Sequence, residues 1–175
     1  LEIYLNKISS IIAELMVRIL SYKSNQFVYN IPQLKKFLQK LIEGIYTTTI
    51  IQNIFIDRNR NPPKIYIPKV EQEWFETDLT DITNDYTNTN KNLIKFELEK
   101  CQNLYKKSDL CVNIIDLKQK PAIKLLKNLF QNINTKIEKK KYDVYTHYIE
   151  LSNFDIIKCF ISNLSICDLF SFTYN

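Results

Sequence analysis

The 175-residue chain is almost without glycine, and Gly44 is the only one that it contains. Loops that bind the phosphates of nucleotides need several glycines, because a backbone approaches a pyrophosphate closely only where side chains are missing. The P-loop and the dinucleotide-binding fingerprint are therefore both excluded. Gly44 instead follows an apolar helical pattern, and we expect it to end that helix.

Residue types that bind metals or perform catalysis are also few. The four cysteines, Cys101, Cys111, Cys159 and Cys167, include no pair spaced as in a zinc site. His147 is the single histidine, and no nucleophile lies in a recognisable catalytic motif. We therefore expect buried, reduced cysteines in an intracellular protein. We also expect a partly buried structural histidine, no metal or other cofactor, and no enzymatic activity.

Long apolar runs are missing as well. No run approaches the ~18 residues that a helix needs to cross a bilayer, so the sequence predicts a soluble protein with no membrane partner. Hydrophobic residues make up 45% of the chain, enough for a core in one large domain or two small ones. The chain starts at Leu1 within an amphipathic pattern, which is typical of a domain cut from a longer protein.

Apolar residues recur at helical spacing in several segments. Ile8, Ile12, Leu15 and Ile19 follow one another at steps of four, three and four, which predicts a helix over residues 3–20 with one apolar face. Start signals and the same periodicity predict four more helices. The first of these begins after Asn30 and Pro32, and the second spans residues 93–107. The third follows Pro121, and the fourth follows Ser152 or Asn153.

Short β-branched and aromatic runs lie between these helices. Residues 54–57 and 64–67 flank a turn of Asn, Arg and Pro, which is typical of a β-hairpin with a basic tip. Residues 47–51 favour a strand or a short, poorly formed helix. Further short strands are predicted at residues 26–29, 110–113 and 142–149.

Helix, helix and charged hairpin therefore occur twice along the chain. This order predicts a helix-rich α+β fold made of tandem winged helix-turn-helix modules. We expect the first module, with an acidic extension, at residues 1–83 and the second at residues 93–175. An acidic stretch followed by the polar residues 87–90 predicts a linker at residues 84–92.

The net charge of +5 lies in the second half, where residues 91–175 hold 14 Lys and Arg against 9 Asp and Glu. Basic side chains on a helix face or at a hairpin tip could contact nucleic-acid phosphates or a partner protein. An ordinary solvated surface is the other interpretation. The candidate contacts are Arg58, Arg60, Lys120, Lys124, Lys127, Lys139, Lys140 and Lys141.

Aromatic residues offer two further hypotheses. Tyr142, Tyr145 and Tyr148 alternate with polar residues and could stack on single-stranded bases, or they could pack within the fold. Phe172 and Tyr174 lie in an alternating apolar run near the chain end. This run either forms a docking surface for another protein or completes the core of the second module.

Tandem winged helices with an elongated first hairpin and an acidic connection resemble the C-terminal half of the middle subunit of the CST telomere complex. That subunit is similar to the middle subunit of replication protein A, and a protist version belongs to the telomerase holoenzyme. The resemblance implies a non-catalytic protein-interaction module in the nucleus, at the chromosome telomere. Its implied partners are other CST-like and telomerase subunits and DNA polymerase α–primase, in support of complementary-strand synthesis.

Two other functions stay open. A winged-helix DNA-binding protein, transcriptional or architectural, would insert a recognition helix into the major groove. An all-helical adaptor domain would have helix, in place of a hairpin, over residues 46–67. For the chain alone, the modest net charge predicts only weak binding of single-stranded DNA.

Overall fold

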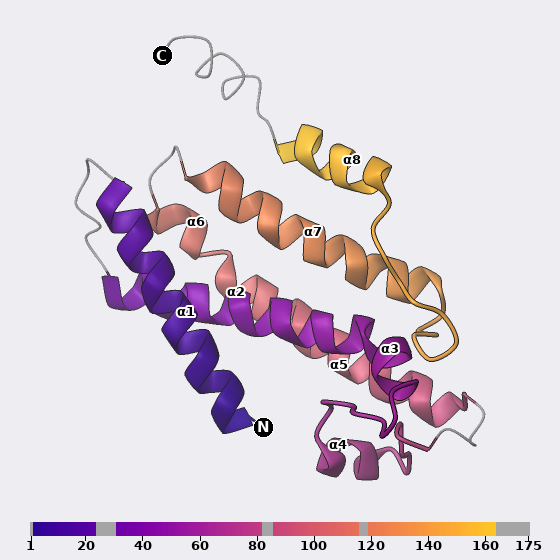
Figure 1. Ribbon diagram of the computed structural model, residues 1–175. Helices are drawn as coiled ribbons and strands as arrows, with labels where there is room; N and C mark the ends of the chain where they lie inside the picture. The colour runs from indigo at the N-terminus through magenta and orange to yellow at the C-terminus, as the bar shows by residue number, and fades with distance from the viewer. Residues whose placement is uncertain (1, 24–30, 82–85, 116–118, 164–175) are drawn as a thin grey trace.

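The computed structural model describes residues 2–23, 31–81, 86–115 and 119–163. Over these residues the chain forms helices and no strand, so the predicted α+β class with tandem winged helix-turn-helix modules is wrong (Figure 1). The fold is all-α. Its helices are α1 (Glu2–Lys23), α2 (Ile31–Gln52), α3 (Ile54–Arg58), α4 (Lys69–Trp74), α5 (Asn88–Ser108), α6 (Cys111–Ile114), α7 (Lys120–Lys139) and α8 (Asn153–Asn163).

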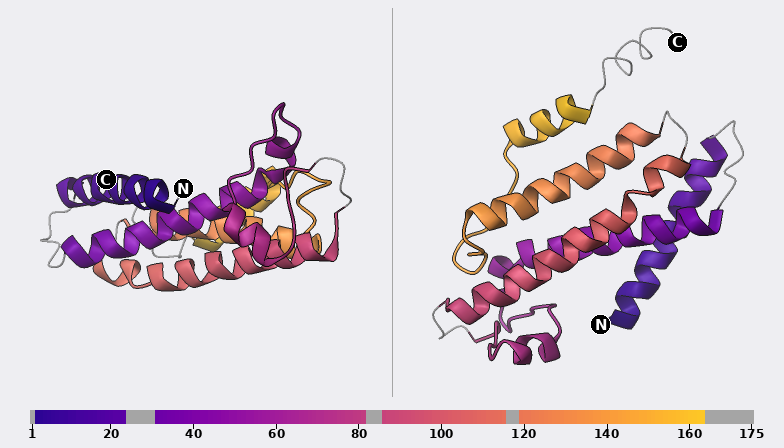
Figure 2. Two further views of the ribbon diagram at one scale, coloured as in Figure 1. Left: turned by 90° about the horizontal axis from the view of Figure 1, so that it is seen from below. Right: turned by 180° about the vertical axis from the view of Figure 1, so that it is seen from behind.

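The two long helices α2 and α5 form the centre of the molecule. They lie side by side and run in opposite directions, as Figure 1 and both views of Figure 2 show. α1 crosses the outer side of α2, and α7 packs against α2 and α5. α8 lies along α7 at the edge of the molecule.

A hydrophobic core joins these helices. Leu34 and Leu38 of α2, Leu93 and Leu98 of α5, and Ile137 of α7 are all buried in it. The core therefore takes side chains from both sides of the predicted domain boundary.

The predicted linker at residues 84–92 contributes the start of α5. The Thr87 hydroxyl accepts a hydrogen bond from the Asn90 backbone N–H, and this caps the helix. Residues 84 and 85 lie outside the described residues. The division into separate folding units at residues 1–83 and 93–175 stays a prediction.

The helices predicted from apolar periodicity are confirmed as α1, α2, α5, α7 and α8. The predicted cap of the last one is also present. The Ser152 backbone N–H donates to Asp155 Oδ2 at 2.9 Å, and the Asp155 N–H donates to the Ser152 hydroxyl at 3.2 Å. This reciprocal pair satisfies two N–H groups at the start of α8.

The second helix does not end at Gly44, because α2 continues to Gln52. Residues 47–51 are helical despite their β-branched side chains. The hydroxyls of Thr47 and Thr49 donate to the carbonyls of Glu43 and Ile45, each at 2.9 Å. These bonds satisfy both hydroxyls one turn back along the helix, so a Thr-rich segment is tolerated there.

The predicted β-hairpin at residues 54–67 is wrong as well. Residues 54–58 form α3, and residues 59–68 are irregular. Ile54 and Ile67, one from each predicted strand, are both buried in the helical core. Burial against neighbouring helices thus outweighs the local β propensity of these two runs.

The strands predicted at residues 110–113 and 142–149 are also wrong. Residues 111–114 form α6, and residues 142–149 are irregular chain in which Val144, Tyr145 and Ile149 are buried. Their apolar side chains fill the core without pairing in a sheet. The strand predicted at residues 26–29 lies outside the described residues.

The scarcity of glycine has a structural consequence at the ends of helices. Within the described ranges, three residues other than glycine have a left-handed backbone: Glu76 (φ 51°) after α4, and Lys141 (φ 54°) and Tyr142 (φ 63°) after α7. A side chain is strained in this conformation, which glycine adopts freely.

Replacing Glu76 with Gly is therefore expected to raise the free energy of unfolding by about 0.5 to 1 kcal/mol, because glycine removes the left-handed strain. Glu73, which is exposed within α4, provides the matched control. Glu73→Gly should lower the free energy by about 1 kcal/mol, the usual cost of glycine within a helix. Urea unfolding measures both changes, and equal effects of the two substitutions would contradict the left-handed assignment.

Candidate functional site

α1 has one face of small side chains and one face of large aliphatic side chains, and the face of small side chains is the buried one. Ser9 and Ala13 are fully buried and Val17 is 5% exposed, and these residues recur every four positions. Their small side chains let α1 lie close to α2, against which α1 packs.

The residues that give α1 its strong periodicity face solvent. Ile8 is 44% exposed, Ile12 40%, Leu15 53% and Ile19 57%. We call these four residues the α1 seam. Ile11, 53% exposed, lies beside them. Isolated apolar residues are common on protein surfaces, but a row of aliphatic side chains along one helix is a candidate binding surface.

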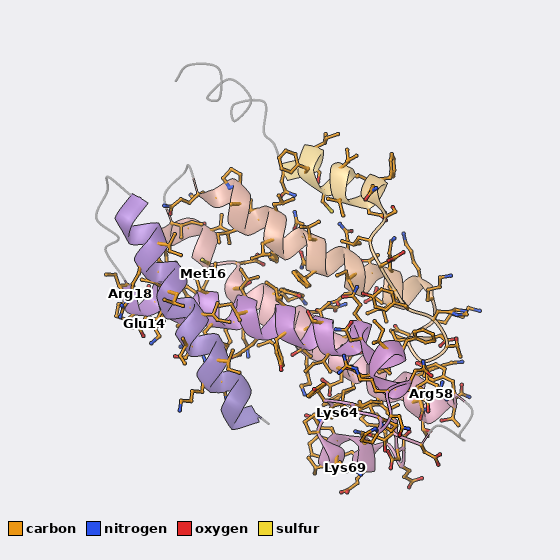
Figure 3. The ribbon with its side chains drawn as sticks, viewed as in Figure 1. Glu14, Met16, Arg18, Arg58, Lys64 and Lys69 are labelled. Atoms are coloured by element: carbon orange, nitrogen blue, oxygen red, sulfur yellow. The ribbon has the colours of Figure 1, made fainter. Side chains whose placement is uncertain are left out.

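Polar contacts fix the direction in which the α1 seam points. Glu14 accepts hydrogen bonds from Arg18 of the same helix and from Lys35 of α2, each at 3.0 Å. Figure 3 shows Glu14 and Arg18 beside each other on α1. The Lys35 and Arg18 contacts hold the pKa of the Glu14 carboxyl below its usual range. Met16 also packs against the core, so α1 cannot simply rotate its seam inward.

α8 carries a second exposed apolar face. Phe154 is 74% exposed, Ile157 55% and Ile161 65%, whereas Cys159 is buried against α7. Lys136 of α7 forms an ion pair with Asp155 at 2.6 Å. α8 is thus attached to the molecule by few groups, and most of its apolar side chains remain in solvent.

The predicted lysine stripe of α7 is interrupted. Lys124 is exposed and Lys120 is partly buried, but Lys127 is only 14% exposed and forms an ion pair with Asp109. Lys127 is therefore less accessible to phosphate than its position in the stripe suggested.

The remaining lysine candidates, Lys139, Lys140 and Lys141, are exposed at the other end of α7. At about 1.5 Å per residue, the length of this helix separates them from Lys120 by roughly 28 Å. The structure therefore does not bring the two lysine groups together. Contact of either group with nucleic acid stays a prediction.

Arg58 has a structural role in this fold. Its guanidinium lies 3.5 Å from the centre of the Tyr145 ring, and the same ring is stacked on that of Tyr86 with 5.4 Å between ring centres. The Tyr145 hydroxyl donates to the Asp81 carbonyl at 2.6 Å, and Tyr145 is only 1% exposed. Tyr145 is therefore not accessible for stacking on a nucleic-acid base.

The other residues that the sequence singled out differ in their exposure to solvent. Arg60 is exposed and pairs with the buried carboxylate of Asp57 at 3.2 Å. Tyr142 is partly buried and Tyr148 is 41% exposed. His147 is exposed, not partly buried as predicted. Phe172 and Tyr174 lie outside the described residues.

Three of the four cysteines lie in the described part of the chain. Cys101, Cys111 and Cys159 are buried and free, as predicted, whereas Cys167 is outside the described residues. Burial raises the pKa of the Cys101 thiol to about 12 and that of Cys111 to about 11. Both are therefore unreactive thiols at neutral pH.

Clusters of three or more potential metal ligands do not occur among the residues that the structure describes. In the same residues, no helix combines the length and the apolar character that crossing a membrane requires.

A cleft of about 260 Å³ lies between α2, α5 and the irregular residues 66–68. Two buried carboxyl groups, Glu43 and Glu97, line it together with Lys100. Lys100 Nζ lies 2.7 Å from Glu71 Oε1 and 3.2 Å from Glu97 Oε2. Burial, and then the neighbouring Glu71 carboxyl, raises the pKa of Glu97 to about 8, although Lys100 opposes this shift.

Sequence patterns could not reveal this charged cluster. Glu97 and Lys100 are one turn apart on α5, which is an ordinary spacing for an ion pair on a helix surface. Glu71 comes from α4, and only the folded chain brings it to Lys100.

Comparison with known proteins gives no family. No protein-family model matches the chain, and no curated protein matches its sequence. The resemblance to the CST telomere subunit depended on two winged helices, which the described residues do not form. The telomeric role, its partners and the nuclear localisation stay predictions.

Proposed function

We propose that this chain is a non-catalytic helical adaptor domain that binds an amphipathic helix of a partner protein along the α1 seam. The solvent-exposed row of Ile8, Ile12, Leu15 and Ile19 carries this proposal. The all-α architecture favours the all-helical alternative over a hairpin, because α2 and α3 cover residues 46–52 and 54–58, whereas residues 59–67 are irregular and not helical as that alternative required. A winged-helix DNA-binding protein is not proposed, because the described residues form no sheet.

The spacing of the α1 seam favours a helix as its partner. Steps of four, three and four average about 3.7 residues, close to the 3.6-residue turn of an α-helix, so the seam runs almost straight along one side of α1. A partner helix with the same period could place its apolar side chains between those of the seam. A partner strand would match a period of two, which the seam lacks.

The amount of exposed apolar surface favours a reversible interaction. Full burial of one aliphatic side chain is worth about 1.5 to 3 kcal/mol, and each seam residue is already about half buried, so each adds roughly 1 kcal/mol. Four residues then provide about 4 kcal/mol, which only matches the lower limit of the cost of association. The α1 seam therefore needs further contacts, and it fits a transient complex better than an obligate one.

Replacing Ile12 or Leu15 with Glu is expected to remove the partner while leaving the fold intact. Each substitution places a charge in the proposed interface but keeps the side chain in solvent in the free protein. The amount of partner recovered with the tagged full chain from its native cells should fall at least about tenfold, which corresponds to 1.4 kcal/mol or more. The free energy of unfolding should stay within about 0.5 kcal/mol of the wild type.

Ser10→Glu is the matched control, because it adds the same charge to α1 away from the seam. Partner recovery should be unchanged with this variant. If the Ile12 and Leu15 variants retained every partner of the wild type, the proposed function would be rejected. A large loss of stability in either variant would show that the seam is part of the core.

A further inference from the structure

The cluster of Glu71, Glu97 and Lys100 brings three ionisable groups together at the contact between α4 and α5. The side chains of Glu71 and Glu97 are 8% and 3% exposed, while Lys100 is 37% exposed. One ammonium therefore faces two deeply buried carboxyl groups. With all three groups charged, the cluster has a net negative charge, and its two carboxyl groups are shielded from water.

Among the residues that the structure describes, the neighbouring elements do not supply the missing positive charge. From α2, Glu43 faces the same cleft, and Lys40 pairs with it at 2.7 Å, so these two charges compensate each other. The irregular segment contributes the neutral Tyr66, and α1 contributes the neutral Asn6. The charge of the cluster must be balanced within the cluster itself.

A proton on Glu97 balances the charge of the cluster. Glu71 Oε1 binds Lys100, but Glu71 Oε2 is buried without a hydrogen-bond partner. Two ionised carboxylates cannot hydrogen-bond to each other, whereas a protonated Glu97 can donate to Glu71. Protonation thus supplies a donor to the Glu71 carboxyl and removes one of the two negative charges.

We propose that Glu71, Glu97 and Lys100 form a proton-dependent latch that holds α4 against α5 and releases it when Glu97 loses its proton. The raised pKa of Glu97 is consistent with this role. Release affects the cleft directly, because Tyr66, Ile67 and Pro68 line it and immediately precede α4. The latch is therefore a pH-sensitive device that controls access to the cleft, and it is independent of the α1 seam.

The direction of the pH effect follows from proton uptake on folding. Glu97 has an ordinary pKa of 4.5 in the unfolded chain and one of about 8 in the folded chain, so the folded chain binds the extra proton between these values. The contribution of the latch is complete below pH 4.5 and is lost as the pH rises to about 8. The latch should accordingly be closed in mildly acidic solution and open in mildly alkaline solution.

The only tryptophan of the chain reports on this movement. Trp74 belongs to α4, and its ring lies edge-on to Phe96 of α5 with 6.4 Å between ring centres. Trp74 fluorescence and its quenching by acrylamide should be measured in the full chain from about pH 6 to about pH 9, below the ordinary tyrosine pKa of about 10. Because Trp74 is already 64% exposed, the expected signal is a change in its emission as the contact with Phe96 is lost, in one titration step with a midpoint near pH 8.

Three variants distinguish titration of Glu97 from titration of other groups. Glu97→Gln imitates the protonated side chain, and it should keep its fold and lose the titration step. Glu71→Gln removes the facing charge and should lower the midpoint by about one unit or more. Glu99→Gln, an exposed neighbour on α5, should titrate like the wild type.

The latch is overturned by any of three results. These are the absence of a step in the wild type, an unchanged step in Glu97→Gln, and loss of the folded state in Glu97→Gln at neutral pH. The last result counts against the latch because a neutral amide at position 97 should be at least as compatible with the buried site as a carboxyl group that is protonated there.

Discussion

Replacing Gly44 with Leu is expected to lower the free energy of unfolding by about 3 kcal/mol, which is the upper end of the cost of overpacking a core. A β-carbon at position 44 would lie 2.9 Å from Tyr105 Cε1 and 3.2 Å from Tyr105 Cδ1. The tyrosine cannot easily move away, since it is fully buried and its hydroxyl lies 2.9 Å from the Thr48 hydroxyl. The higher helix propensity of leucine offsets only about 1 kcal/mol.

Two further variants test whether the effect comes from the contact between α2 and α5. Lys36→Leu introduces the same side chain on the exposed side of α2, and it should change stability by no more than about 0.5 kcal/mol. Combining Gly44→Leu with Tyr105→Leu should cost less than the sum of the single changes, because a smaller residue at 105 makes room. An unchanged or higher stability of Gly44→Leu in urea unfolding would contradict the close approach of the two helices.

Replacing Lys100 with Met is the other change with a large expected effect. It keeps the apolar part of the side chain but leaves Glu71 buried without its cation. Removing one partner of a buried ion pair costs about 3 to 5 kcal/mol, and the lower value applies because Lys100 is itself 37% exposed. We therefore expect a loss of about 3 kcal/mol near neutral pH.

The pH dependence and a second substitution identify the cause of that loss. The effect of Lys100→Met should shrink towards about pH 5, because carboxyl groups without a cation take up protons more readily. Adding Glu71→Gln should restore much of the stability, since the uncompensated charge is then gone. Lys95→Met, at an exposed position of α5, should be nearly neutral. If the loss were independent of pH, the buried charge would not be its cause.

The long helices could be predicted from the sequence because their apolar periodicity extends over several turns. The segment of residues 54–67 could not, since two short β-branched runs around a turn fit a hairpin and a helix–loop equally well. Only the burial of Ile54 and Ile67 among helices distinguishes these possibilities. Errors in this segment and in the short runs at residues 110–113 and 142–149 together led to the prediction of two winged helices.

Periodicity was also insufficient to show which face of α1 is buried. The pattern of Ile8, Ile12, Leu15 and Ile19 was evident, but the small residues Ser9 and Ala13 pack instead. Close packing of two helices favours small side chains at the contact, and a sequence pattern weighted by hydrophobicity does not detect them. This difference between the apolar face and the packed face is the basis of the proposed interaction site.

Most of the candidate basic residues are exposed, but the contacts of Lys127 and Arg58 could not be predicted. Asp109 lies eighteen positions before Lys127, and Tyr145 lies eighty-seven after Arg58. Such pairs depend on how the helices pack. Local sequence therefore could not show that these two basic side chains already have contacts within the protein.

Site-specific photocrosslinking of α1 tests the proposed adaptor role most directly. A photoreactive amino acid would replace Ile12 in the α1 seam or, as the control, Ser10 on a different face, each in the full chain within its native cells. Mass spectrometry would then identify the crosslinked segment. We predict a discrete adduct from position 12, with the crosslink in an amphipathic helical segment of another protein, and none from position 10. Equal adducts from both positions, or no protein adduct from position 12, would contradict the proposal that the α1 seam binds a partner helix.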